Sequence, residues 1–240
     1  MPRSHIAIVK LILVATMVAA AFGVAIPAAS QSGADRLPLT HDLFLGGYVY
    51  GRVFRYYSRS LANFATSTLE QKERDREMMI SLSVTMERHI RALRCPQNVL
   101  QAVFDLESEL SARGSPKEFR LGELDRFPQC VDQYRPELHR YWWTGRSVGS
   151  IFFLFENLDH PQVELRPDSS DRVLLEELKY LQDSSRSLYG RSDMPPQAES
   201  ALKSVENMRV ASSQKGRLDS TTRARIRQYM DAITEPFLPR

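Results

Sequence analysis

The stretch from Asp42 to Phe64, DLFLGGYVYGRVFRYYSRSLANF, decides the fold class through the spacing of its apolar residues. Apolar side chains recur every three or four positions, which is the period of an α-helix. Three arginines, Arg52, Arg55 and Arg59, fall on the opposite side of that helix. The stretch therefore predicts an amphipathic helix whose arginine face could meet an acidic partner. The residues of its apolar face are Leu43, Gly46, Val49, Tyr50, Val53, Phe54, Tyr57, Leu61 and Phe64.

A second helix is expected directly after this one. Ser67 and Glu70 stand three residues apart, as in a capping box, and open a helix that should run to about Arg94. Its first half, residues 70–77, is charged and has little apolar periodicity, so we expect it to be solvated.

The middle of the chain continues in the same way. Pro96 suits the first turn of a third helix, and Gly114 stands just beyond its expected end. Residues 115–135 predict short helical turns. Pro136 starts another helix, which either stops near Gly145 or continues to Leu158.

The last seventy residues predict three amphipathic helices. Ser170 caps the first, Pro195 and Pro196 begin the second, and Asp219 or Ser220 caps the third. Strand alternation is absent, so the chain is predicted to be all-α, an irregular assembly of about seven or eight amphipathic helices after a cleaved signal peptide. The inward residues of the third of these helices are Ile226, Tyr229, Met230 and Ile233.

Residues 1–30 resemble a secretory leader. Arg3 and Lys10 give a positive start, residues 11–26 are apolar, and small residues precede a cleavage point between Ser30 and Gln31. Such a leader predicts export to the periplasm or cell envelope, with secretion as a second choice. The alternative is an uncleaved anchor, although the apolar run is short of the roughly 20 residues that a spanning helix needs.

Three regions follow from these patterns. Residues 1–30 are expected to be the signal peptide, residues 31–160 a helical domain with one disulfide, and residues 161–240 a C-terminal three-helix segment. The linker between the last two is expected at residues 159–171, which contain two prolines and two serines.

The charge balance argues against nucleic acid as a partner. The chain has 32 basic and 29 acidic residues, a formal net charge of +3. The leader holds two of the basic residues and no acidic one, so the remainder is nearly neutral and has no long basic block.

The only two cysteines, Cys95 and Cys130, predict a structural disulfide in an oxidising compartment. Neither has a second cysteine or histidine at zinc spacing, so we expect no metal and no cofactor.

One pattern admits a catalytic interpretation. Residues 145–149, GRSVG, match the G-x-S-x-G of serine hydrolases, in which the glycines permit a strand-to-helix turn that exposes the serine. A cryptic serine hydrolase that uses Ser147 is therefore one alternative. The other interpretation is helix packing, because Gly145 and Gly149 lie four apart, as do Gly47 and Gly51. Each pair would leave a patch of small residues on one helix face.

Three further segments resemble pieces of the small periplasmic immunity proteins that neutralise secreted peptidoglycan amidases. The segments are GYVYG at 47–51, Cys95-Pro96, and FPQC at 127–130. The resemblance implies a helical, disulfide-linked inhibitor that blocks the cleft of a toxin with an inserted loop. Gln129 departs from the expected Phe-Pro-Cys ending, and 110 residues follow Cys130.

Taken together, the residues favour an exported helical protein that binds an unidentified protein partner and has no catalytic residue of its own. Such a protein has no stable membrane span once its leader is cleaved. Tight interfaces concentrate their binding energy in Trp, Tyr and Arg side chains. The candidate partner-binding residues are Tyr48, Arg52, Arg55, Tyr56, Trp142 and Trp143.

Overall fold

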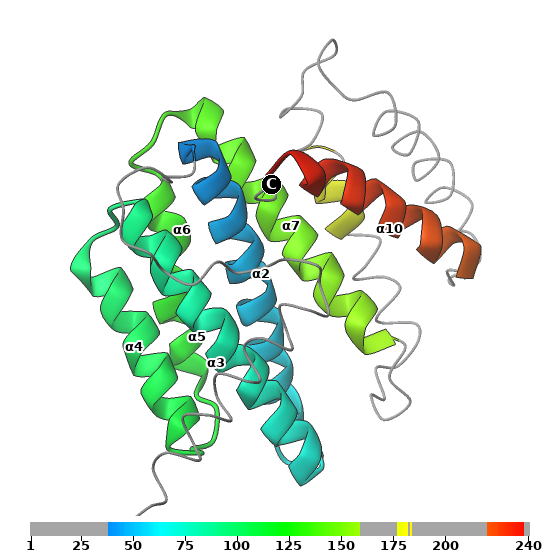
Figure 1. The fold of residues 1–240 in the computed structure, drawn as a ribbon. Coiled ribbons are helices and arrows are strands. Elements are labelled where there is room, and N and C mark those ends of the chain that lie inside the picture. Colours follow the sequence, from blue (N-terminus) through cyan, green and yellow to red (C-terminus); the bar gives the residue numbers. More distant parts are fainter. Residues whose placement is uncertain (1–37, 159–176, 182, 184–219, 238–240) are drawn as a thin grey trace, which may run out of the picture. The chain divides into compact units, whose positions relative to one another are not determined.

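The computed structural model describes residues 38–158, 177–181, 183 and 220–237. These residues form helices and no strand, which confirms the all-α prediction (Figure 1). They belong to one contact unit, Pro38–Phe237. The leader, the linker, the second C-terminal helix and the boundary at 160–161 lie outside the described residues. The helices are α2 (Leu39–Asn63), α3 (Leu69–Ala92), α4 (Gln97–Ser111), α5 (Glu118–Leu124), α6 (Arg126–Val131), α7 (Pro136–Leu158) and α10 (Ser220–Thr234), with a 3-10 turn η1 (Glu235–Phe237).

Helix α2 is the central helix of the described residues. It lies between α3 on one side and α7 on the other, and α5, α6 and η1 also contact it (Figure 1). Its buried apolar side chains recur at helical spacing from Leu43 to Tyr57, as predicted, whereas Phe54, Leu61 and Phe64 of the predicted face are only partly buried. Because α2 is surrounded in this way, part of its polar face is also buried. The arginines of that face therefore lie among the other helices.

The prediction of a capping box at the start of α3 was right in kind and wrong by one residue. Thr68 is the N-cap and not Ser67: its side chain accepts from the backbone N–H of Gln71 at 3.2 Å. The Gln71 side chain in turn accepts from the backbone N–H of Thr68 at 2.9 Å. Helix α4 ends at Ser111, three residues before Gly114, and Arg113 takes the left-handed conformation (φ 55°) that ends the helix.

Helix α7 continues through Gly145 to Leu158, which decides between the two predicted endings. Its glycines pack directly on the backbone of α2. A Cβ atom added at Gly145 would lie 2.0 Å from the carbonyl oxygen of Phe44, and one at Gly149 would lie 2.0 Å from that of Tyr48. Helix packing is therefore the role of this glycine pair, as the spacing predicted.

The glycines of α2 make the reciprocal contacts. A Cβ atom at Gly47 would lie 2.2 Å from the carbonyl oxygen of Trp142, and one at Gly51 would lie 2.3 Å from that of Arg146. Residue numbers rise together along both helices at these contacts, so α2 and α7 run parallel. The backbones approach closely enough for Cα–H groups to face carbonyl oxygens across the interface.

Aromatic rings close the end of this interface near α6. The indole of Trp142 is fully buried and lies against Gly46, and the ring of Phe127 from α6 meets it edge-on at 4.4 Å between centroids. At the opposite end, Phe153 packs edge-on against Tyr56 at 4.7 Å. Glycine has no side chain that could fill the space beside these contacts, and the aromatic rings fill it instead.

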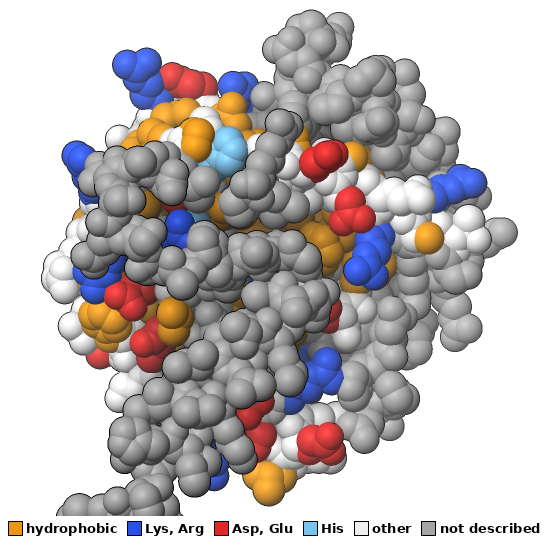
Figure 2. All heavy atoms as spheres, in the orientation of Figure 1, with side chains coloured by type: hydrophobic (Ala, Val, Ile, Leu, Met, Phe, Trp, Pro, Cys, Tyr) orange, Lys and Arg blue, Asp and Glu red, His pale blue; other side chains and the backbone are white. Residues whose placement is uncertain are grey.

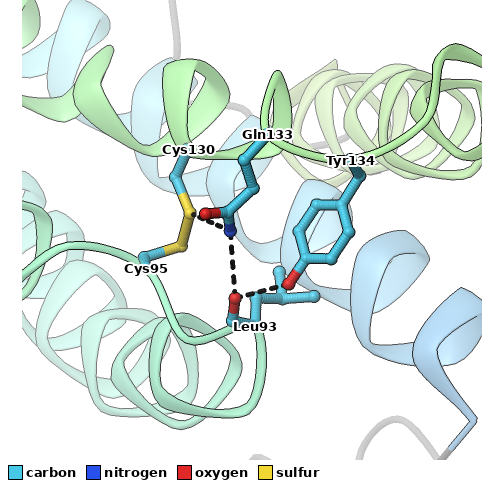
Figure 3. Close-up of a disulfide and its surroundings, with 5 residues drawn as sticks. All are labelled: Leu93, Cys95, Cys130, Gln133 and Tyr134. Carbon is cyan, nitrogen blue, oxygen red and sulfur yellow. Dashed lines mark hydrogen bonds between the residues drawn. A yellow bond between two sulfur atoms is a disulfide. The ribbon is translucent and has the colours of Figure 1, made fainter.

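The predicted disulfide joins Cys95 to Cys130, with 5.5 Å between their Cα atoms. It connects the start of α4 to α6. Beside it, the backbone carbonyl of Leu93, left free by the end of α3, accepts hydrogen bonds from the side chains of Gln133 and Tyr134 (Figure 3). The bridge and these two hydrogen bonds together fix the residues that precede α7 to the end of α3.

The last described elements pack on the start of α2. Phe237 of η1 stacks on Phe44 with 4.2 Å between ring centroids, and the backbone carbonyl of Pro236 lies 3.0 Å from Nε2 of His41. The inward residues predicted for the final helix are buried. They are Ile226, Tyr229, Met230 and Ile233.

Replacing Gly47 with alanine should lower the free energy of unfolding by about 3 kcal/mol or more, because its Cβ would collide with backbone that cannot rotate away. The measurement is urea unfolding followed by circular dichroism. Gly122→Ala is the matched control, since a Cβ there meets nothing within 4 Å. It should raise the stability by about 0.5–1 kcal/mol. Similar effects from both changes would contradict the close α2–α7 contact.

Removing the disulfide by changing Cys95 and Cys130 to alanine should cost about 4 kcal/mol, because the bridge closes a loop over a sequence separation of 35. Unfolding of the original chain should show the same loss when a reductant is added. The double variant should not respond to the reductant. A loss below about 1 kcal/mol would show that the loop contributes little to stability.

Candidate functional site

The three arginines of α2 are inside the helix assembly and not on a free basic face. Each guanidinium pairs with a carboxylate from a different element. We call these three residues the arginine row. Its pairs are Arg52 with Glu156 of α7, Arg55 with Glu177 of residues 177–181, and Arg59 with Asp75 of α3.

Arg52 is the most enclosed member of the row. Its Nη2 atom donates to both oxygens of Glu156 at 2.7 Å, and the hydroxyl of Tyr56 donates to the same carboxylate at 3.0 Å. Burial alone would lower the pKa of Arg52, but the surrounding oxygens of Tyr48, Glu156 and Tyr56 outweigh it and raise that pKa. Burial, followed by the Glu156 charge, raises the pKa of Tyr56. Tyr56 therefore stays neutral and acts as a hydrogen-bond donor.

Arg59 connects α2 to α3. Its Nε atom donates to Oδ2 of Asp75 at 3.1 Å, and its guanidinium lies over the rings of Tyr56 and Phe153 at 5.2 and 4.8 Å. Burial raises the pKa of Asp75, although the nearby Arg59 opposes that shift. The expectation that residues 70–77 are wholly solvated was wrong at Asp75, because α3 turns this residue toward α2.

Arg55 lies at the accessible end of the site. Its side chain is 26% exposed, and its guanidinium donates to Oε1 of Glu177, whose side chain is only 5% exposed. Oε2 of the same carboxylate lies 4.0 Å from Nη1 of Arg146 on α7. The Arg146 guanidinium in turn lies over the indole of Trp143, 5.6 Å from its centroid. One acid thus stands between two arginines from neighbouring helices, with an exposed tryptophan beside it.

The six candidate partner-binding residues are distributed unevenly over this arrangement. Trp142, Tyr56 and Arg52 are buried, and their side chains make internal contacts. Tyr48 is partly buried, and its hydroxyl accepts from Arg52 at 3.3 Å. Trp143 is 44% exposed, and Arg55 lies near it through the shared contacts of Glu177 and Arg146. Only Arg55 and Trp143 among the six therefore stand at an accessible edge.

Ser147 is buried in the middle of α7, between the two glycines that pack on α2. The hydrolase alternative requires a strand-to-helix turn that raises the serine to a surface. A continuous helix occupies residues 136–158 instead. The glycines of the G-x-S-x-G pattern are accounted for by their contacts with Phe44 and Tyr48.

The segments that resemble immunity proteins have structural roles. Gly47 and Gly51 contact α7, and Pro96 is the N-cap of α4 beside the disulfide. Phe127 packs on Trp142. These contacts account for the segments through packing within the chain.

The described histidines contact single polar groups of the protein. Nδ1 of His89 lies 3.0 Å from Oδ1 of Asp42, and Nε2 of His139 lies 2.9 Å from the carbonyl oxygen of Tyr134. Within the described part of the chain, no group of three His, Cys, Asp or Glu side chains is placed to hold a metal ion. His160 lies outside it. Acidic and basic side chains are interspersed among the described residues on the face seen in Figure 2.

Sequence reasoning missed the carboxylate partners of the arginine row and the contribution of Arg146. One signal was present: Glu156 directly follows the apolar run from Ile151 to Phe155, where a charge has to find a partner. Glu177 carried no such signal, because it stands among other acidic residues.

No helix among the described residues combines the length and apolarity needed to cross a bilayer. Comparison of the chain with family models, curated proteins and solved structures finds no match. We therefore argue the function of this protein from its own residues.

Replacing Glu156 with alanine should cost about 3 kcal/mol or more, because it leaves the buried Arg52 guanidinium without its carboxylate. Glu137→Ala, at an exposed position of the same helix, should change stability by less than about 0.5 kcal/mol. The measurement is urea unfolding.

Combining Arg52→Met with Glu156→Met should be less destabilising than Glu156→Ala alone, because no charge is then left buried. A double variant that is as unstable as the sum of its single variants would contradict this explanation.

Proposed function

We propose that this is an exported helical protein that acts by binding a protein partner in the periplasm or cell envelope. The leader-like residues 1–30 and the disulfide support export, since such bridges persist in oxidising compartments. The binding surface would consist of Trp143, Arg146 and Arg55, which we call the Trp143 surface.

The observation that carries the proposal is the exposure of Trp143 beside two arginines. An indole that is 44% exposed leaves apolar area in water, and covering that area by a partner would be favourable. The cation of Arg146 over its face limits the motion of both side chains, which lowers the entropy cost of an interface. Tryptophan and arginine are also the residue types on which binding energy concentrates.

Phe119 on α5 offers a close comparison. It is 57% exposed and carries the guanidinium of Arg120 5.0 Å from its ring centroid. Arg120, however, is buried and has several acidic partners, which are Asp105, Glu109 and Glu123. Trp143 and Phe119 are therefore both exposed, and each has an arginine over its ring. They differ in how far nearby carboxylates neutralise the charge of that arginine.

The test is photo-crosslinking in cells, with a benzophenone amino acid placed at position 143 or, as the control, at position 119 of the full chain. We expect a discrete crosslinked protein from position 143 and none from position 119. Arg146→Gln should lower the yield several-fold, because it removes the cation over the indole without placing a like charge against Glu177. Equal crosslinking from both positions, or none from position 143, would contradict the proposal.

Once the crosslinked protein is identified and purified, Trp143→Ala should weaken its binding at least tenfold, as expected for an interface anchor of about 1.4 kcal/mol or more. Isothermal titration calorimetry gives this ratio. Phe119→Ala is the control and should leave the affinity unchanged within about twofold.

A further inference from the structure

A single carboxylate lies between two arginines at the accessible edge of the α2–α7 pair. Oε1 of Glu177 accepts from Nη2 of Arg55, and Oε2 lies 4.0 Å from Nη1 of Arg146. The side chains of both arginines are 26% exposed. We call these two arginines the carboxylate clamp. Glu177 belongs to residues 177–181, which also bury Leu178 and Leu181.

Among the described residues, the clamp has two positive charges and one facing carboxylate. Arg52 pairs with Glu156 and Arg59 with Asp75. Glu177, in contrast, is shared, and within the described residues it is the only ion-pair partner of both Arg55 and Arg146. Two cations facing one anion leave a surplus positive charge that favours a further or better-placed carboxylate.

The contact of Glu177 with the clamp is also incomplete. Its Oε2 atom is buried and has no hydrogen-bond donor in the described part of the chain, since Arg146 stands beyond hydrogen-bonding distance. A buried oxygen without a donor loses its hydration with no compensation. A carboxylate whose two oxygens each accept a hydrogen bond, one from each arginine, would fit the clamp better than Glu177 does.

We propose that the carboxylate clamp is a recognition site for an acidic segment of a protein partner, and that Glu177 occupies this site in cis until the partner displaces it. The inference rests on the proposed function, since the clamp shares Arg55 and Arg146 with the Trp143 surface. The partner segment would place a carboxylate between the two arginines and an apolar side chain against Trp143. Occupation in cis lowers the apparent affinity by the fraction of molecules in which the clamp is filled.

The test uses the full chain and a fluorescent peptide with the sequence of residues 172–183, RVLLEELKYLQD, which presents the same glutamate in trans. Glu177→Lys puts a third cation into the clamp and should release residues 177–181. Peptide binding, measured by anisotropy, should be at least tenfold tighter than to the unchanged chain. Asp183→Lys makes the same charge change at an exposed position nearby, and it should bind the peptide no more tightly than the unchanged chain.

Two further variants test whether the peptide binds through the carboxylate clamp. A peptide with glutamine in place of the glutamate at position 177 should bind the Glu177→Lys chain at least tenfold more weakly. Adding Arg146→Gln to that chain should have a similar effect on the original peptide. Glu177→Gln, which keeps the shape of the side chain, is the second variant if Glu177→Lys lowers the helical circular dichroism.

Hydrogen–deuterium exchange of amides 177–181 separates the ways in which the inference could fail. Faster exchange in Glu177→Lys without tighter peptide binding would overturn recognition in trans. Unchanged exchange in both Glu177 variants would overturn the idea that this glutamate holds the segment in place. Neither result bears on crosslinking at position 143, so the proposed function stands or falls on that separate experiment.

Discussion

The close parallel contact between α2 and α7 is the constraint on which the other contacts depend. Four glycines remove every Cβ atom from the line where the two backbones meet, so carbonyl oxygens of one helix face Cα–H groups of the other. At this distance the two helices cannot slide or rotate without a backbone collision. The direction in which each remaining face of the two helices points is thereby set.

One result of this constraint is that the arginines of α2 pair with carboxylates of the protein. A helix covered by α3, α7 and the residues near 177 has no side left for solvent along much of its length. Its arginines therefore need carboxylates from the covering elements, and each of those elements supplies one. Such ion pairs add little net stability, because removing two charges from water is costly. Their effect is to specify which element lies next to which turn of α2.

The helices could be predicted from sequence because their signals are local. The apolar period, the prolines before α4 and α7 and the glycine spacing all lie within a few residues of the feature they determine. The start of α3 was missed by one residue because Ser67 and Thr68 are both good caps, each with a Glu or Gln three residues later.

The candidate site could be predicted only in part, because its partners come from distant segments. No local pattern connects Arg55 with Glu177, which follows it by 122 residues. Trp142 and Trp143 are adjacent, and one is buried while the other is exposed, since neighbouring residues on a helix point about 100° apart. Which of the two faces the core depends on the rotation of α7, and that is set by Gly145 and Gly149 against α2.

The parallel course of α2 and α7 has a consequence for the order in which the molecule can assemble. Gly47 and Trp142 are about 95 positions apart, and everything between them has to be synthesised and folded back before they can meet. The sulfur bridge lies inside this span and shortens the path to about 60 positions, which eases ring closure by only about 0.4 kcal/mol. Until α7 is made, the face of α2 that packs on it has no cover, and the growing chain exposes apolar surface during that interval.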